Sequence, residues 1–226
     1  MNEQAKFEGI ILAAGLSKRM NSWKPGIEID DIPILIWAIV PMVQICDKVI
    51  VVGGYNYNSL VNLLDDSIVL SKKQKDKIRL IENKNYINGM FSSVKCGIQN
   101  VSPESNGIFI SLGDMPFVLS STYQKLIECF SEENQFEVFK PALFGKGNEN
   151  NSGITVGHPI LIKSTIVNHI LQCKDDEILK DVLQAFKHKI CPVKDRDINT
   201  DIDNISDLQT AKSYMKNLKT YNREIK

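Results

Sequence analysis

Short apolar runs alternate along this chain with segments whose apolar residues recur at helical spacing. The runs predict strands at residues 7–13, 48–52, 77–81, 108–112, 136–141, 160–162 and 189–193. The helical spacing predicts helices at residues 34–45, 59–64, 92–99, 120–130, 165–171, 177–186 and 205–218. This alternation is typical of an α/β protein, so we expect a three-layer, Rossmann-like, mostly parallel sheet with helices on both faces.

Polar positions between these elements predict caps and turns. Ser120, Ser121 and Thr122 are expected to cap the helix that follows them. Residues 144–153 are polar and rich in glycine, which predicts a mobile loop beside a binding site. In open parallel sheets ligands bind beyond the carboxyl ends of the strands, so the loops at that edge are the first place to look for chemistry.

Composition narrows the class of protein. The chain has 226 residues, 43% of them hydrophobic, so we expect one domain over residues 1–226 with a core at about 7–218. Lys plus Arg and Asp plus Glu each total 27, so no net charge favours nucleic acid or an anionic membrane. No apolar run is long enough to span a bilayer, and no signal core follows Met1. The five cysteines are scattered, which predicts reduced thiols in a cytoplasmic protein.

The loop after the first apolar run carries the strongest chemical signal. Ala13, Ala14 and Gly15 leave room for backbone N–H groups to approach phosphate oxygens. Arg19 and Lys24 follow, and they supply the positive charge that a nucleoside triphosphate requires. The same pattern is compatible with an ordinary strand-to-helix turn and two solvated bases. The chain has no Gly-x-x-x-x-Gly-Lys-[Ser/Thr], and no Gly-x-Gly-x-x-Gly opens the first helix, so P-loop and dinucleotide folds are disfavoured.

A second apolar run, at residues 108–112, ends in Gly113-Asp114-Met115-Pro116. An aspartate at the carboxyl end of a buried strand is a suitable hard ligand for Mg²⁺, which in turn bridges phosphate oxygens. Aspartate is also common in turns for local hydrogen-bonding reasons, so this motif alone is weak.

Five segments in order resemble the nucleotidyltransferases related to molybdenum cofactor cytidylyltransferase. They are Leu12-Ala-Ala-Gly-Leu-Ser-Lys-Arg-Met20 with Lys24, Gly113-Asp-Met-Pro116, the Asn85–Val94 segment with its Gly-Met and serines, Gly157-His-Pro159, and Asp201-Ile-Asp-Asn-Ile-Ser-Asp-Leu208. They extend from about residue 10 to about residue 210. Asp31 and Ile32 stand where the family usually has Gly and Lys. The resemblance implies the nucleotidyltransferase form of the Rossmann-like sheet.

The resemblance also implies a metal site. Asp114 and Asp203 would together hold Mg²⁺, with phosphate oxygens and water completing the shell. The alternative for Asp203 is a helix cap, because Asp203 or Asn204 directly precedes an amphipathic segment. Asp201 and Asp207 are expected to be structural.

Phosphate contacts are implied for the first loop. Lys24 would stabilise the charge that develops between the α-phosphate and the departing pyrophosphate. Arg19 would hold the β- and γ-phosphates, with Ser17 and the amides of Ala14 and Gly15 beneath them.

The remaining site residues are expected at the nucleoside and the acceptor. Asn85, Gly89 and Ser93 would contact either one, because a helix beginning after Gly89 offers free N–H groups to an anion. Ser93 and its neighbour Ser92 are also compatible with simple capping. His158 would lie at the acceptor pocket, although an ordinary hydrogen-bonded histidine fits the pattern nearly as well.

The implied reaction is nucleotidyl transfer, in which an acceptor phosphate oxygen attacks the α-phosphorus in line and displaces pyrophosphate. Ala14 favours CTP, since guanylyl relatives tend to have glycine there. The implied acceptor is molybdenum cofactor, and a molybdenum hydroxylase apo-enzyme would receive the product. Two alternatives stay open: a related transferase with a sugar, polyol or choline phosphate acceptor, and a carrier module that binds cofactor without turnover.

Overall fold

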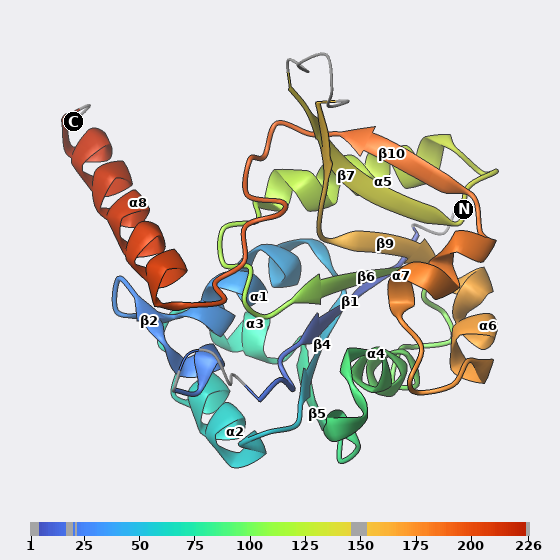
Figure 1. Ribbon diagram of the computed structural model, residues 1–226, viewed down its shortest axis with the longest axis horizontal. Coiled ribbons are helices and arrows are strands. Elements are labelled where there is room, and N and C mark those ends of the chain that lie inside the picture. Colours follow the sequence, from blue (N-terminus) through green and yellow to red (C-terminus); the bar gives the residue numbers. More distant parts are fainter. Residues whose placement is uncertain (1–4, 17–19, 21, 146–152, 225–226) are drawn as a thin grey trace.

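The computed structural model describes residues 5–16, 20, 22–145 and 153–224, and the side chains of residues 217–224 are not described. Eight strands of this part form one sheet in the order β10-β7-β9-β6-β1-β4-β5, with β8 paired to β7 (Figure 1). Their bounds are β1 Phe7–Leu12, β4 Lys48–Gly53, β5 Ile78–Glu82, β6 Gly107–Leu112, β7 Val138–Phe144, β8 Ile154–Val156, β9 Ile160–Lys163 and β10 His188–Pro192.

Most strand pairs are parallel. Strands β5, β4, β1 and β6 run in one direction, and β10 runs parallel to β7. Strand β9 lies antiparallel between β6 and β7, so the carboxyl ends of β6 and β7 meet the same edge of the sheet. The predicted fold class is therefore confirmed, with β8 and β9 as its antiparallel members.

Two helical layers cover the sheet because its central strands are apolar on both faces. Ile11 of β1 packs on one face, under α1 (Ile34–Ile45), α2 (Tyr57–Asp65) and α5 (Ser120–Glu132). Ile10 packs on the other, under α4 (Met90–Ile98), α6 (Val167–Gln172) and α7 (Leu179–Val182). Short elements complete the chain: α3 Lys72–Lys75 and the 3-10 helices η1 Lys24–Gly26, η2 Tyr86–Asn88, η3 Ser164–Ile166 and η4 Leu183–Ala185. Helix α8, Ile205–Glu224, leads away from the body (Figure 1).

The predicted elements exist, with shifted boundaries. The helix expected at 59–64 spans Tyr57–Asp65, and the one expected at 177–186 is divided into α7 and η4. The glycine-rich segment expected to be a mobile loop joins β7 to β8, and its residues 146–152 lie outside the described part. No described helix is long and apolar enough to cross a membrane.

A hairpin that we did not predict follows η1. Strands β2 (Glu28–Ile29) and β3 (Ile32–Pro33) pair antiparallel through Asp30 and Asp31, whose φ angles are 58° and 60°. Aspartate tolerates this left-handed conformation better than most residues, so Asp30 and Asp31 are compatible with the turn. Ile29 is fully buried beside Ile202 and Ala211, so the hairpin supports the base of α8.

The prediction that Ser120, Ser121 and Thr122 cap α5 is wrong. The cap position is Leu119, and no side chain of its own accepts a hydrogen bond there. The acceptor at this end of α5 is the buried carboxylate of Asp195, from a distant loop. Its Oδ2 accepts from Leu119 N at 2.8 Å and from Thr122 Oγ1 at 2.7 Å. This contact fastens the loop after β10 to the start of α5.

Candidate active site

A cavity of about 540 Å³ opens at the carboxyl ends of β1 and β6. One wall is the loop after β1, from Leu12 to Leu16, and a second is Leu112 to Asp114. The third consists of Tyr86, Ile87, Gly89 and Met90, from η2 and the start of α4. Lys24 and Asp203 complete its polar end. The cavity therefore lies where ligands bind in open parallel sheets.

Lys24 joins two aspartates that are distant in the sequence. Its Nζ donates to Asp114 Oδ2 and to Asp203 Oδ1, each at 2.8 Å, across 90 and 179 residues of chain. The three side chains are only 14%, 25% and 27% exposed. Burial opposes the charge on Lys24, but the hydrogen bonds to Asp114 and Asp203 outweigh it, and the pKa of Lys24 is raised. Lys24 is therefore a fixed cation.

The start of α8 decides which residues cap that helix. Asp207 Oδ2 accepts from the backbone N–H groups of Asp203 and Asn204, at 2.8 and 3.0 Å. Asn204 Oδ1 accepts from Asp207 N at 3.1 Å. These reciprocal bonds form a capping box, which confirms a structural role for Asp207 and leaves the Asp203 carboxylate with Lys24. Ile202 N donates to the Asp114 carbonyl at 3.0 Å, which brings the two aspartates side by side.

The first loop lines the cavity from Leu12 to Leu16. Ala13 N donates to Val52 O at 2.9 Å, and Ala14 O accepts from Tyr55 N at 3.3 Å, so both alanines are fixed to the end of β4. A Cβ added to Gly15 would meet no described residue within 4 Å. Ser17 and Arg19, which we expected at the phosphates, lie outside the described residues.

The segment from Asn85 to Ser93 differs from expectation in which residues face the cavity. Gly89 lines it, with a φ of 104° that side chains rarely adopt. Asn85 and Ser93 do not line it. Ser93 is buried, and its Oγ accepts from Asn83 Nδ2 at 3.0 Å.

Sequence reasoning missed four residues of this wall. They are Tyr86, Ile87 and Met90, which line the cavity, and Asn83, which lies behind them. Tyr86, Ile87 and Met90 lie inside the segment that carries the resemblance, but neither apolar spacing nor charge distinguishes them as site residues, and Asn83 lies outside that segment.

His158 does not line the cavity either. Its backbone N–H donates to the Ile198 carbonyl at 2.6 Å, and its buried Nδ1 has no hydrogen-bond partner among the described residues. Burial lowers the pKa of His158, so the imidazole is neutral near pH 7. The Gly157-His158-Pro159 segment is bonded to β7 through Gly157 N and Pro141 O, at 3.1 Å, and His158 N bonds it to the loop that leads from Asp195 to Asp203.

Gly157 packs directly against the backbone of Ile198, and this packing predicts an effect on stability. A Cβ on Gly157 would overlap the carbonyl oxygen of Ile198, which is backbone and cannot rotate away. We expect Gly157→Ala to lower the free energy of unfolding by about 1–3 kcal/mol, measured by urea denaturation. Gly145→Ala is the matched control, since among the described residues its Cβ would meet only Gly153 O, at an ordinary 3.5 Å. Equal stability of the two variants would contradict the packing argument.

The polar end of the cavity fits a divalent cation. Asp114 Oδ2 and Asp203 Oδ1 already converge on one positive group, and the buried Oδ1 of Asp114 has no hydrogen-bond partner in the described part. No cluster of three or more His, Cys, Asp or Glu residues occurs among the described residues. The chain would thus supply two carboxylates, and other oxygens would complete the shell.

Comparisons with known proteins found a matching family model and a similar curated protein. The family model described as MobA-like NTP transferase domain matches residues 9–190. Molybdenum cofactor cytidylyltransferase of Escherichia coli (strain K12) is 29% identical to this chain over 203 residues, 90% of this chain and 94% of that protein.

Two solved structures are similar in fold. The manganese complex of Rv0371c from Mycobacterium tuberculosis H37Rv has a TM-score of 0.69 at 16% identity, over 93% of this chain and all of the other. The 4-diphosphocytidyl-2C-methyl-D-erythritol synthase from Anaerococcus prevotii DSM 20548 has a TM-score of 0.70 at 15% identity, over 94% and 96% of the two chains. At these identities the likeness concerns the fold alone.

Proposed function

The chain belongs to the MobA-like NTP transferase domain family and is a nucleotidyltransferase, and from this premise we propose that it transfers CMP from CTP to the terminal phosphate of molybdenum cofactor. The single observation that carries the proposal is the convergence of Asp114 and Asp203 on Lys24 at the polar end of the cavity. The choice of substrates is supported by the cytidylyltransferase that is 29% identical over nearly its whole length.

In the proposed reaction, an acceptor phosphate oxygen forms a bond to the α-phosphorus of CTP. The bond from that phosphorus to the bridging oxygen breaks, and pyrophosphate leaves with the electron pair. Such transfers depend on positioning and on neutralisation of charge rather than on covalent help from the protein. The chain would then hold the triphosphate across its loop after β1 and place the acceptor opposite the leaving group.

Lys24 is the central cation of this scheme. It is fixed by two carboxylates and keeps its charge, so it would stabilise negative charge between the α-phosphate and pyrophosphate. The backbone of Ala14 and Gly15 would approach the phosphates from beneath. For Arg19 and Ser17 the proposed phosphate contacts rest on the family resemblance.

Asp114 and Asp203 would hold Mg²⁺, which supplies charge neutralisation to the phosphate oxygens when it is bound. The unpartnered Asp114 Oδ1 supports this assignment. A solved structure of similar fold is a manganese complex, which is consistent with a divalent metal at such a site.

The apolar end of the cavity would receive the nucleoside. Leu16, Ile87 and Met90 offer apolar surface there, and Ala14 remains the basis for preferring CTP to GTP. His158, Asn85 and Ser93 lie away from the described cavity, so any contact of theirs with the acceptor is indirect or lies beyond it. Delivery of the product to a molybdenum hydroxylase apo-enzyme follows from the choice of acceptor.

The test of this function is pyrophosphate release with Mg²⁺, molybdenum cofactor and either CTP or GTP, followed by analysis of the product. We expect release with CTP and a cytosine dinucleotide product. A GMP adduct alone would contradict the base preference, and release only with a sugar or polyol phosphate would contradict the acceptor. Binding of CTP and cofactor without pyrophosphate release would favour the carrier module instead.

A further inference from the structure

The turn that forms the third wall of the cavity is held from behind by a residue that does not line the cavity. Asn83 directly follows β5, and its side chain is buried with 5% exposure. Its backbone N–H donates to Gly53 O at 2.8 Å, which extends the pairing of β4 and β5 by one residue. Asn83 therefore belongs to the rigid sheet, whereas the residues after it form the cavity wall.

The Asn83 side chain bonds to both sides of that turn. Its Oδ1 accepts from Asn85 N at 3.0 Å, which fixes the chain as it enters η2. Its Nδ2 donates to Ser92 Oγ at 2.9 Å and to Ser93 Oγ at 3.0 Å, on the first turn of α4. One buried amide thus sets the distance between the end of β5 and the start of α4.

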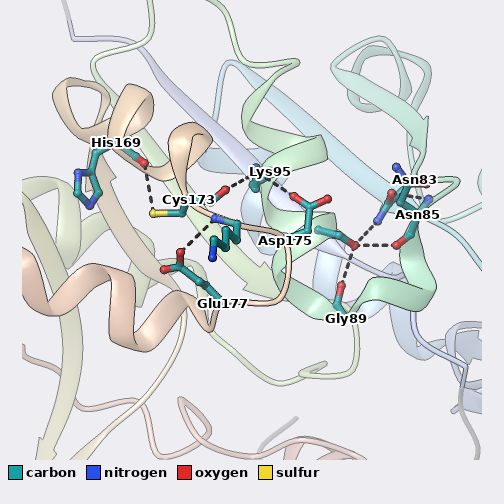
Figure 2. Close-up of polar contacts among 10 residues, drawn as sticks. Asn83, Asn85, Gly89, Lys95, His169, Cys173, Asp175 and Glu177 are labelled. Carbon is teal, nitrogen blue, oxygen red and sulfur yellow. Dashed lines mark hydrogen bonds and ion pairs between the residues drawn. The ribbon is translucent and has the colours of Figure 1, made fainter.

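Ser92 connects Asn83 to the backbone of the turn. Its hydroxyl lies 3.0 Å from Asn85 O and 2.8 Å from Gly89 O, and Figure 2 draws these contacts together with that of Asn83. Gly89 has a φ of 104°, which glycine adopts about as readily as a negative φ, so contacts with the rest of the molecule select this conformation. One of these contacts is the hydrogen bond from Ser92 Oγ to Gly89 O, and Ser92 is itself held by Asn83.

The rest of α4 has separate anchors. Lys95 Nζ donates to Cys173 O at 2.6 Å and to Asp175 Oδ1 at 2.8 Å, beside the Asn83 group in Figure 2. Phe91, Val94 and Ile98 are buried against the sheet. Loss of the Asn83 amide would therefore leave the helix docked and would free mainly the turn before it.

We propose that Asn83 is a positioning residue that shapes the nucleotide-binding wall from Tyr86 to Met90. This inference rests on the proposed function, and it assigns the wall to the nucleotide and not to the acceptor. Because Asn83 acts on a binding surface, its loss should weaken nucleotide binding equally before and during the reaction. That effect appears in KM for CTP and leaves kcat nearly unchanged.

The experiment compares Asn83→Ala with the wild-type protein in steady-state pyrophosphate release and in calorimetric binding of CTP. We expect KM and Kd for CTP to rise about tenfold, with kcat and KM for the acceptor within about twofold. A purely structural loss would lower the folded fraction, and so the apparent kcat, at unchanged KM. An unchanged KM and Kd for CTP would overturn the proposal.

Two further variants make the result decisive. Ser92→Ala removes the hydroxyl that touches the turn carbonyls and leaves Asn83 bonded to Ser93, so it carries the same test if Asn83→Ala does not fold. Asn100→Ala is the control, because it removes an amide bond to Cys96 O of 2.9 Å at the opposite end of α4 and should leave KM unchanged. Absence of turnover in the wild type would contradict the proposed function, and the wall would then be judged from Kd for CTP alone.

Discussion

Replacement of Asp114 by alanine is expected to lower the rate of nucleotidyl transfer at least about 1000-fold. In the wild-type protein, Asp114 Oδ2 binds Lys24, and Asp114 Oδ1 has no hydrogen-bond partner in the described part and could bind a cation. The variant loses both oxygens. Asp203 alone would then have to hold both positive groups. The measurement is pyrophosphate release under single-turnover conditions, at saturating Mg²⁺ and nucleotide.

The control for this variant is Asp47→Ala. Asp47 Oδ2 accepts from Phe7 N at 3.0 Å, at the amino end of β1 and so at the opposite edge of the sheet. It should lose some stability and keep its rate. Retention of pyrophosphate release within tenfold of wild type by Asp114→Ala would exclude Asp114 as an essential metal ligand.

Replacement of Lys24 by methionine is expected to have the second largest effect. The variant keeps an apolar stem of similar length and removes the charge, so the transfer rate should fall about 100- to 1000-fold. It also removes the cation that Asp114 and Asp203 share. The free energy of unfolding should therefore fall by about 1–3 kcal/mol in the absence of metal.

Divalent metal should reverse that loss of stability. Mn²⁺ would bind two carboxylates that no longer hold a lysine, so it should raise the melting temperature of Lys24→Met more than that of the wild type. Lys77→Met is the control, since Lys77 Nζ donates to Val43 O and Cys46 O away from the cavity. An equal rise in Lys24→Met and wild type would show that Lys24 and the metal do not share these carboxylates.

The sheet was predictable because its signals are local. A strand buried on both faces, such as β4 with its residues Val49, Ile50, Val51 and Val52, reads as an apolar run, and a helix on its surface has an apolar stripe. The elements that escaped prediction lack such signals. The β2–β3 hairpin is two residues on each side of Asp30 and Asp31, and its pairing depends on packing of Ile29 under α8.

The prediction of the α5 cap was wrong for a different reason. Local sequence offered Ser120, Ser121 and Thr122, but the acceptor is Asp195, which lies 76 residues beyond Leu119. Capping preferences describe the residue that directly precedes a helix. A buried carboxylate from a distant loop instead accepts from the backbone N–H of Leu119 and from the Thr122 hydroxyl, and local sequence has no means of showing it.

For the site, the sequence by itself determined the two loops at the carboxyl edge, with Lys24 after β1 and Asp114 after β6, because a polar motif at the end of a buried strand can lie only at that edge. It also identified Asp203 through resemblance. Only the tertiary structure decided that Asp203 meets Lys24 while Asp207 caps α8, and that Asn83 braces the cavity wall from behind. The physical reason is that a side chain's partner is set by which loops the sheet order brings together. That order depends on packing across the whole chain, whereas each strand and helix depends mainly on its own pattern.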